Sequence, residues 1–209
     1  MTFLRTLVLS LFSLVVALSG AVILAVIGAA IYFSPGLPDV RQLQDFELHT
    51  PLRIFTNDGK LIGEFGEERR MAIDFDEIPQ DMINALIAAE DASYFDHAGV
   101  DPRGLARAAV ELVQSGGTIQ SGGSTITMQV ARNYMLTLDQ TFTRKIREIL
   151  LALQMEQILD KEEIFELYVN KIFLGNRAYG IAAAAETYYD KPLAELSLAE
   201  TAMIAGLPK

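Results

Sequence analysis

The sequence predicts a mainly α-helical domain with one N-terminal transmembrane helix and a short β-hairpin. Three observations support this fold class. Residues 6–38 carry no charge, two short strand-like runs lie between residues 52 and 65, and helical patterns follow one another from residue 80 onward. The hydrophobic content of 51% and the mean hydropathy of +0.26 are also high for a soluble globular protein, which independently favours a membrane segment.

The uncharged stretch is long enough to cross a bilayer. Leu7–Phe33 alone forms a helix of roughly 40 Å at about 1.5 Å per residue, whereas the hydrocarbon core is about 30 Å thick. The alternative is a cleaved signal peptide, but the apolar core of such a peptide typically runs only about 7–15 residues. Arg5 is the sole charged side chain before the span, which favours a cytoplasmic N-terminus and an external body.

A β-hairpin is expected soon after the span. The segment Ser34–Pro38 contains two prolines and a glycine, which break the helix and start a short connector. Two strand-like runs follow, Leu52–Thr56 and Lys60–Phe65, and Asn57-Asp58-Gly59 joins them. Asn and Asp tolerate left-handed backbone and Gly adopts it freely, so this sequence is typical of a hairpin turn.

After Pro79 the pattern becomes helical and stays so. The expected helices are Gln80–Ala92, Arg103–Gln114, Ser124–Met135, Thr141–Leu159, Lys161–Asn170, Gly180–Tyr188 and Ser197–Ala205. We therefore predict a cytoplasmic tip and anchor at residues 1–38, a connector with the hairpin at 39–70, and a helical domain at 71–209 that is long enough for one buried core. The final residues follow a closing helix without any mark of a natural terminus, which leaves room for a further domain.

Composition excludes several classes of function. The net charge of −10 argues against nucleic-acid binding, because a phosphate backbone requires a dense basic surface. There is no cysteine, and with only His49 and His97 a histidine-rich metal site is not expected. The segment Gly117–Ser124 has the outline of a phosphate-binding P-loop, but Gly123 occupies the position that needs lysine and no strand precedes it.

A carboxylate lies on the apolar face of the first helix after Pro79. Ile83, Leu86 and Ile87 define that face, and Glu90 falls seven residues after Ile83 on the same face. Such a carboxylate points toward the core or into a cleft cut in it, where it can accept a proton from a reacting group. On this helix alone, a structural ion pair with an arginine explains the position equally well.

The helix predicted at Thr141–Leu159 begins with a cluster of cations. Arg144, Lys145 and Arg147 lie in its first turns, where positive charge opposes the helix dipole. Four-residue spacing places Arg144 beside Glu148. The apolar stripe lies elsewhere on the helix, at Phe142, Ile146, Ile149 and Leu153. The second half is apolar almost all round, so we expect it to run through the core. A basic start on a buried helix suits a polyanion site, although a solvated charge cluster has the same composition.

Taken together and in order, five segments resemble the glycosyltransferase family 51 domain of class A penicillin-binding proteins. They are EDASYFDHAG (Glu90–Gly99), GGSTITMQVARN (Gly122–Asn133), RKIREILLALQME (Arg144–Glu156), IFELYVNKIFLG (Ile164–Gly175) and RAYGIAAAAETYYDK (Arg177–Lys191). The resemblance runs from about Pro51 to the end of the chain, and LIGEFGEERR (Leu61–Arg70) is also similar to the segment that leads into this domain. One such motif alone is a weak signal, but five in order at family-like spacing are highly specific.

The resemblance implies a lysozyme-like helical fold and a set of site residues. Glu90 matches the catalytic base of the family and Glu148 its second carboxylate, while Arg144 and Lys145 match the basic pair that faces a diphosphate. The substrate-side positions are Asp91, His97, Ser124, Thr125, Gln129, Arg132 and Asn133. Among these, we expect His97 to orient the loop in which it lies.

Two positions depart from the family pattern. Met128 stands where the family commonly has a glutamine, and Arg132 where it commonly has lysine, which replaces a point charge by a planar fork. We interpret both as tolerated variation, but Met128 puts a direct substrate contact at that position in doubt. Glu166, Tyr168 and Asn170 fall on a further motif, for which we expect a structural role.

For activity, the resemblance implies a peptidoglycan glycosyltransferase that polymerises lipid II, a disaccharide-pentapeptide on undecaprenyl diphosphate, into β-1,4-linked glycan strands. No metal-ligand cluster is visible and no cofactor is required, although a divalent cation (Mg²⁺ or Mn²⁺) near Glu148 can do part of the electrostatic work. The implied location is the bacterial cytoplasmic (inner) membrane, crossed once, with the catalytic domain on the periplasmic face among other wall-synthesis proteins. A transpeptidase domain is expected after Lys209.

Two other functions stay open at this stage. A lytic enzyme of the same fold would use Glu90 as a general acid on finished glycan. A non-catalytic, membrane-tethered scaffold would instead recruit wall-assembly proteins. The basic segment favours synthesis, because a neutral glycan needs no such charge, and the presence of both Glu90 and Glu148 argues against a decayed active site.

Overall fold

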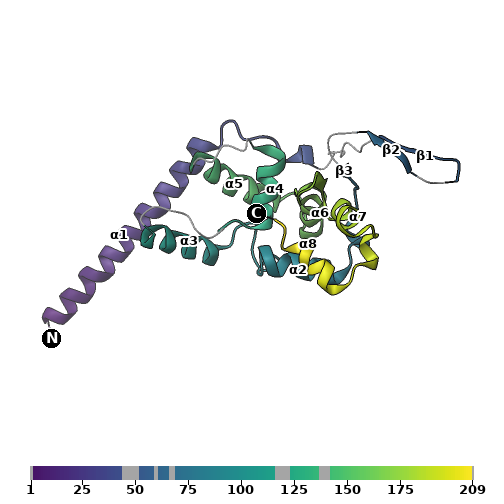
Figure 1. Ribbon diagram of the computed structural model, residues 1–209. Coiled ribbons are helices and arrows are strands. Elements are labelled where there is room, and N and C mark those ends of the chain that lie inside the picture. Colours follow the sequence, from purple (N-terminus) through teal and green to yellow (C-terminus); the bar gives the residue numbers. More distant parts are fainter. Residues whose placement is uncertain are drawn as a thin grey trace.

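In the computed structural model a single long helix leaves a helical body, and a β-hairpin extends from the opposite side (Figure 1). The structure describes residues 2–43, 52–58, 61–65, 69–115, 123–136 and 142–208. The helices are α1 (Thr2–Phe33), α2 (Gln80–Glu90), α3 (Pro102–Gln114), α4 (Ile126–Met135), α5 (Phe142–Met155), α6 (Lys161–Lys171), α7 (Ile181–Tyr189) and α8 (Leu198–Ala205). The predicted fold class, mainly helical with an apolar N-terminal helix and a hairpin, is confirmed.

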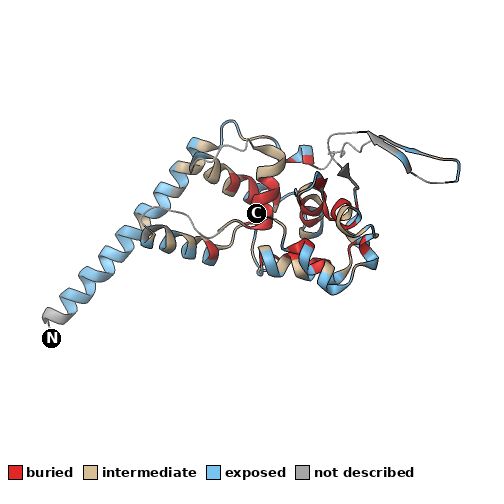
Figure 2. Cartoon of the chain, in the orientation of Figure 1, coloured by how far each residue is buried: buried red, intermediate tan, exposed pale blue. Residues whose placement is uncertain are grey.

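The helix α1 is the transmembrane candidate. Its segment Arg5–Phe33 has 29 residues and a mean hydropathy of 2.7, so length and composition allow it to cross a membrane. Its apolar side chains are exposed along most of the helix (Figure 2). Exposed apolar surface on this scale marks a contact with lipid or with another protein. The helix begins at Thr2, earlier than the span predicted from Leu7.

The predicted hairpin is present. Strand β1 (Leu52–Phe55) pairs antiparallel with β2 (Leu61–Phe65), and a register shift follows Ile54. Asn57 and Asp58 form the described part of the turn, whereas Gly59 lies outside the described residues.

A second, parallel pair joins β3 (Arg69–Arg70) to β4 (Ala178–Tyr179). The sequence did not predict this pair, because two-residue strands are too short to show a period. Three short 3₁₀ helices are also described: η1 (Val40–Leu43), η2 (Phe75–Glu77) and η3 (Leu193–Glu195).

The core lies among α2, α4, α6, α7 and α8, and α4 is at its centre. Helix α4 packs against both α5 and α6, while α2 packs against α8. The first six residues of α4, Ile126–Ala131, are all buried (Figure 2). Fully buried apolar side chains from the other helices, such as Leu86, Phe165 and Ile181, complete this core. A helix that starts inside the protein needs its first N–H groups satisfied by other residues, which bears on the site below.

Two helices end at least two residues earlier than the sequence predicted. Helix α2 stops at Glu90 rather than Ala92, because Asp91 takes a non-helical backbone with φ −157°. Helix α5 stops at Met155 rather than Leu159, and Asp160 is the N-cap of α6, which begins at Lys161. The Asp160 side chain accepts from the Glu163 N–H at 2.9 Å, and Glu163 accepts from the Asp160 N–H at 2.8 Å. This capping box fixes the start of α6 where the sequence placed it.

The buried face of α5 is not its apolar stripe. Glu148, Leu151 and Met155 are buried, whereas Leu153 is 41% exposed and Ile149 is only half-buried. The expectation that this helix runs through the core is therefore wrong for its stripe side. Helix α5 contacts α1 as well as α4.

Two residues of α6 hold the segment that precedes α2. The Asn170 side chain accepts from the Ile73 N–H at 2.9 Å and donates to the Ile73 carbonyl at 2.8 Å. One turn earlier, Glu166 accepts from the Phe75 N–H at 2.9 Å. Burial raises the pKa of Glu166, and this hydrogen bond opposes the shift. Both contacts agree with the structural role expected for this motif.

A surface ion pair should make α8 sensitive to acid. Lys191 Nζ lies 2.7 Å from Glu200 Oε1, and hydrogen bonds from Lys191 and from Ser197 lower the pKa of Glu200 to about 2. A lowered carboxylate pKa stabilises the fold above the ordinary value near 4.5, and that contribution is lost as the pH falls toward 2. We expect Glu200→Gln to unfold more easily than the wild type at pH 7 and equally easily at pH 2, in thermal unfolding followed by circular dichroism. A constant difference across this range would contradict the assignment.

Candidate active site

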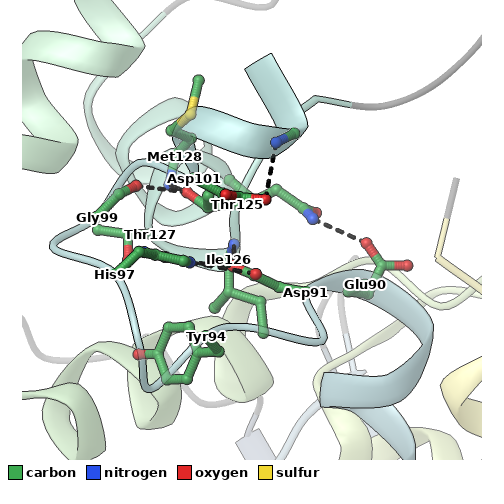
Figure 3. Close-up of polar contacts among 12 residues, drawn as sticks. Glu90, Asp91, Tyr94, His97, Gly99, Asp101, Thr125, Ile126, Thr127 and Met128 are labelled. Atoms are coloured by element: carbon green, nitrogen blue, oxygen red, sulfur yellow. Dashed lines mark hydrogen bonds and ion pairs between the residues drawn. The ribbon is translucent and has the colours of Figure 1, made fainter. Parts of the chain in front are cut away.

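Glu90 ends α2 and faces α4. Its Oε2 accepts a hydrogen bond from Gln129 Nε2 at 2.8 Å (Figure 3). The side chain is half-buried. Among the residues that the structure describes, this amide is its hydrogen-bonding partner, and no arginine pairs with it. The ion-pair explanation left open by the sequence is therefore not favoured, and the carboxylate is oriented without being neutralised.

The neighbouring carboxylate holds the buried start of α4. Asp91 Oδ2 accepts from the Ile126 N–H at 3.0 Å, and His97 Nε2 lies 3.0 Å from the same oxygen (Figure 3). Thr125 caps the helix by accepting from the Met128 N–H at 3.2 Å. A negative charge at a helix N-terminus is also favourable to the helix dipole.

Asp91 and His97 are nearly inaccessible, because their side chains are 4% and 6% exposed. His97 contacts Asp91, which in turn accepts from the Ile126 N–H, and the role expected for His97 in orienting its loop stays a prediction. Thr125 is buried as well and donates to the Gly99 carbonyl at 2.6 Å. Gly99 has φ +82°, and a Cβ there would lie 2.7 Å from the Ala152 carbonyl oxygen, so the loop needs glycine to approach α5 this closely.

A second buried network under α4 was missed by the sequence analysis. Glu156 Oε1 accepts from Thr127 Oγ1 at 2.7 Å and from Lys161 Nζ at 2.6 Å. It therefore ties the first turn of α4 to the end of α5 and the start of α6. Glu156 closes the third motif quoted above, but its spacing alone does not identify these partners.

The basic cluster surrounds a fully buried carboxylate. Glu148 is 1% exposed, with Arg144 Nε 2.9 Å from Oε1 and Lys145 Nζ 3.2 Å from Oε2. Lys145 Nζ also donates to Ser124 Oγ. Burial lowers the pKa of Lys145, and the charges of Arg132 and Arg144 lower it further, while Glu148 opposes the shift. The four-residue pairing of Arg144 with Glu148 was predicted from the sequence.

The donor set around Glu148 does not fit a divalent cation. Each of its oxygens already faces a positively charged side chain, and a metal ion there would be repelled by both. Within the described residues, no group of three or more histidine, aspartate or glutamate side chains could hold a metal ion.

Glu90 and Ser124 line one cavity, which we call the Glu90 cavity. Its volume is about 110 Å³. The lining residues are Glu90, Asp91, Ala92, Ser93, Asp101, Gly104, Arg107, Gly123, Ser124 and Thr125. Ser124 is the link, because it lines this cavity and accepts from Lys145. Arg107, an exposed residue of α3, lies outside the recognised motifs and was missed.

Gln129 leads to a second cavity of about 420 Å³, which we call the Gln129 cavity. It is lined by Gln129, Arg132 and Asn133 of α4, by residues 172–175, and by Tyr188, Leu207 and Pro208. Six predicted substrate-side residues line these cavities: Asp91, Ser124 and Thr125 line the Glu90 cavity, and Gln129, Arg132 and Asn133 line the Gln129 cavity. His97, Arg144 and Lys145 line neither.

Met128 lies on neither cavity and is fully buried. Because Met128 lines neither cavity, the departure from glutamine at this position changes the lining of neither. Arg132, the other departure, does line the Gln129 cavity. The catalytic and binding roles of all these residues stay predictions.

Residues 58–209 match the family model described as Transglycosylase. The chain belongs to the transglycosylase family. The resemblance of five motifs to the glycosyltransferase family 51 domain is thereby confirmed.

Individual relatives of this transglycosylase chain are penicillin-binding proteins. Penicillin-binding protein 1A of Pseudomonas aeruginosa is 60% identical over 194 residues, which are 93% of this chain and 24% of that protein. The protein of the same name from Vibrio cholerae is 47% identical over 201 residues, 96% of this chain and 24% of its own length. A crystal structure of penicillin-binding protein 1A from Haemophilus influenzae aligns with 35% identity and a TM-score of 0.39, over 78% of this chain and 14% of that one. The chain spans about a quarter of the length of these curated relatives.

In this transglycosylase chain, Asp91→Asn should loosen the start of α4. The variant removes the charge that the Ile126 N–H and His97 share, and a weakened buried acceptor typically costs about 1–3 kcal/mol of unfolding free energy. Denaturant unfolding of the detergent-solubilised chain measures this loss. Asp96→Asn, an exposed position in the same loop, is the matched control and should leave stability unchanged. Equal stability of the two variants would contradict the role given to Asp91.

Proposed function

We propose that the chain is the peptidoglycan glycosyltransferase part of a membrane-anchored penicillin-binding protein. Its substrate is lipid II, and its product is a β-1,4-linked glycan strand with release of undecaprenyl diphosphate. One observation carries the proposal: Glu90 and Ser124 line one cavity, and Ser124 accepts a hydrogen bond from Lys145 of the basic cluster.

Glu90 is the proposed general base. A sugar hydroxyl is a poor nucleophile at neutral pH, so its proton must be accepted while the 4-hydroxyl oxygen of the acceptor attacks the anomeric carbon of the growing chain. The Gln129 amide fixes one carboxylate oxygen of Glu90, which leaves the other available for that proton. General-base help of this kind contributes typically about 10²–10⁴-fold.

The basic cluster is proposed to hold the leaving group. As the new C–O bond forms, the bond from the anomeric carbon to the diphosphate breaks, and both electrons leave with the phosphate oxygen. Arg144 and Lys145 each form an ion pair with Glu148, and Lys145 also donates to Ser124. The positive charge of Arg132 also acts on Lys145. Fixed cations stabilise growing negative charge best where water is excluded.

Direct displacement inverts the anomeric carbon, so an α-linked lipid diphosphate gives a β-linked product. The helix α1 is proposed to anchor the chain once in the bacterial cytoplasmic membrane with the body on the periplasmic face. This location is supported by the length and hydropathy of Arg5–Phe33 and by Arg5 at its start. An anchor of this kind keeps the body of the protein close to a substrate that is itself held in the bilayer.

The test is incubation of the detergent-solubilised chain with fluorescent lipid II, followed by gel separation of the products. A ladder of lengthening lipid-linked glycans is expected. Shortening of isolated sacculi would instead identify a lytic enzyme, and tight lipid II binding without turnover would identify a scaffold. Either result would overturn the proposal.

The transfer step is proposed to need no metal, because both Glu148 oxygens already face cations. Chelation with EDTA should therefore leave the polymerisation rate unchanged within about twofold. A loss of activity that added Mg²⁺ or Mn²⁺ restores would refute this part and return a metal to the site.

A further inference from the structure

Phe173, which follows α6, is an exposed aromatic residue that lines a cavity. Its exposed fraction is 54%, and it lines the Gln129 cavity. Single exposed apolar residues are common on protein surfaces, so exposure alone carries no argument. Phe95 is the comparison, because it is 53% exposed and packs beside Tyr94 with 5.1 Å between ring centroids, yet it lines neither the Gln129 cavity nor the Glu90 cavity. The cavity is what distinguishes Phe173.

The backbone after Phe173 forms an unusual turn. Phe173 pairs with Tyr179 in an isolated antiparallel bridge. Between them, Gly175, Asn176 and Arg177 follow one another with φ of +84°, +47° and +64°. Left-handed backbone is unfavourable for a residue that has a side chain, and it persists where the surrounding contacts impose it. The turn is therefore held by its contacts rather than by the local preference of the chain.

Two contacts restrain this turn and the ring beside it. Tyr188 of α7 donates from its hydroxyl to the Leu174 carbonyl at 2.7 Å. A Cβ on Gly175 would lie 2.8 Å from the same hydroxyl, so the turn lies directly against it. The Phe173 ring packs on the Tyr179 ring with centroids 5.0 Å apart. An aromatic ring that is already ordered in this way loses little freedom when a ligand covers it.

The Gln129 cavity also carries side chains that can form hydrogen bonds. Gln129, Arg132 and Asn133 of α4 supply two amides and a guanidinium group. An aromatic face beside such groups matches a pyranose ring, which has C–H bonds on its faces and hydroxyl or acetamido groups around its edge. A lipid tail would instead leave three polar side chains without partners, which is costly. The volume of about 420 Å³ suits a small-molecule site.

We propose that Phe173 is a platform on which a sugar ring of the glycan substrate stacks in the Gln129 cavity, and that Tyr188 is the positioning residue that holds this platform. The inference rests on the proposed function and names a sugar subsite for it. Gln129 both lines the cavity and donates to Glu90, so a ring in the cavity is one side chain away from the proposed base. Tyr188 lines the cavity too, but its hydroxyl already bonds to the turn, which suits support rather than recognition.

The first experiment uses tryptophan fluorescence. The sequence contains no tryptophan, so a single introduced indole reports on its own surroundings. Phe173→Trp and Phe95→Trp are compared in the detergent-solubilised chain, with chitotetraose, the β-1,4-linked tetramer of N-acetylglucosamine, as the probe. The emission of Phe173→Trp should shift to shorter wavelength and saturate with added sugar, because a stacked ring displaces water from the indole. Phe95→Trp, at the equally exposed position, should not respond.

Kinetics on lipid II separate binding from chemistry. Phe173→Leu keeps an apolar side chain but removes the aromatic face, so its KM should rise about tenfold while kcat stays within about twofold. Phe173→Tyr keeps the ring and should retain the wild-type KM. Tyr188→Phe removes the hydrogen bond that supports the turn, so its KM should rise about threefold with kcat unchanged. A merely structural role would lower the melting temperature without separating KM from kcat.

Each outcome decides the inference. An unresponsive Phe173→Trp, an equal response of Phe95→Trp, or a KM of Phe173→Leu within about twofold of the wild type would overturn the platform. A response to free stem pentapeptide but not to chitotetraose would also overturn it and assign the cavity to the peptide. A wild-type KM in Tyr188→Phe would overturn the positioning role.

The two experiments also keep this inference apart from the proposed function, because sugar binding needs no turnover. An inactive wild type with a responsive Phe173→Trp would overturn the proposed function and leave a sugar site. An active wild type with an unresponsive Phe173→Trp would overturn the platform alone.

Discussion

Glu90→Gln is expected to abolish polymerisation of lipid II and to leave the fold intact. Glutamine keeps the size of the side chain, and its carbonyl oxygen can still accept the hydrogen bond from Gln129 that now holds the carboxylate. It cannot accept the hydroxyl proton. We therefore expect a loss of about 10²–10⁴-fold in the rate, measured as product per unit time in the gel assay with fluorescent lipid II.

The matched control for this prediction is Asp81→Asn on the same helix. Asp81 is an exposed residue in the first turn of α2, so its variant should polymerise at the wild-type rate. Thermal unfolding of both variants should coincide with that of the wild type. Full activity in Glu90→Gln would sink the general-base mechanism, and a collapse of its stability would mean that the carboxylate is structural.

The sequence could predict the direction of Glu90 but not what it faces. A period of 3.6 residues places it on the apolar face of α2, and that face meets the rest of the protein. Whether the place is core or cleft depends on Gln129, which is 39 residues away, and no local pattern connects the two. The resemblance to a family supplied that connection.

For α5 the sequence correctly predicted the Arg144–Glu148 contact but not which face of the helix is buried. Four-residue spacing correctly paired Arg144 with Glu148, because the helix geometry alone fixes that distance. The same helix has two apolar faces, and only one can meet α4. The sequence could not tell which face meets α4, because both faces are apolar and α5 also contacts α1, the membrane candidate. Hydrophobicity does not distinguish protein from lipid as the surroundings.

The residues that the sequence analysis missed share one property: they act through long-range packing. Glu156 joins three elements through Thr127 and Lys161, and Arg107 reaches the Glu90 cavity from α3. Neither residue type nor spacing marks such positions. Two-residue strands such as β3 and β4 escape detection for the same reason, since their partners define them.

Glu148→Gln is expected to be the most destabilising substitution at the site. The change leaves Arg144 and Lys145 charged beside a neutral amide, and both side chains are partly buried, at 17% and 34% exposure. Removing one partner from a buried ion pair typically costs about 3–5 kcal/mol. Because Lys145 is about one-third exposed and can be partly hydrated, we expect a loss near the lower end, about 3 kcal/mol of unfolding free energy. Urea unfolding followed by circular dichroism measures it.

The same change should also slow polymerisation, through geometry rather than proton transfer. Glu148 fixes the two cations that are proposed to face the diphosphate, and a shift of about 1 Å in such groups can cost about 10²-fold. Glu162→Gln, at an exposed position on α6, should change neither stability nor rate.

A double variant distinguishes charge balance from loss of a carboxylate as such. If Glu148 serves to neutralise its neighbours, Glu148→Gln combined with Lys145→Met should be more stable than Glu148→Gln alone, because one unpaired cation is then gone. Its rate should stay low, because the diphosphate would still lack a cation. Recovery of the rate together with stability would show that Lys145 plays no part in holding the leaving group, and the proposed division of labour between Glu90 and the basic cluster would fail.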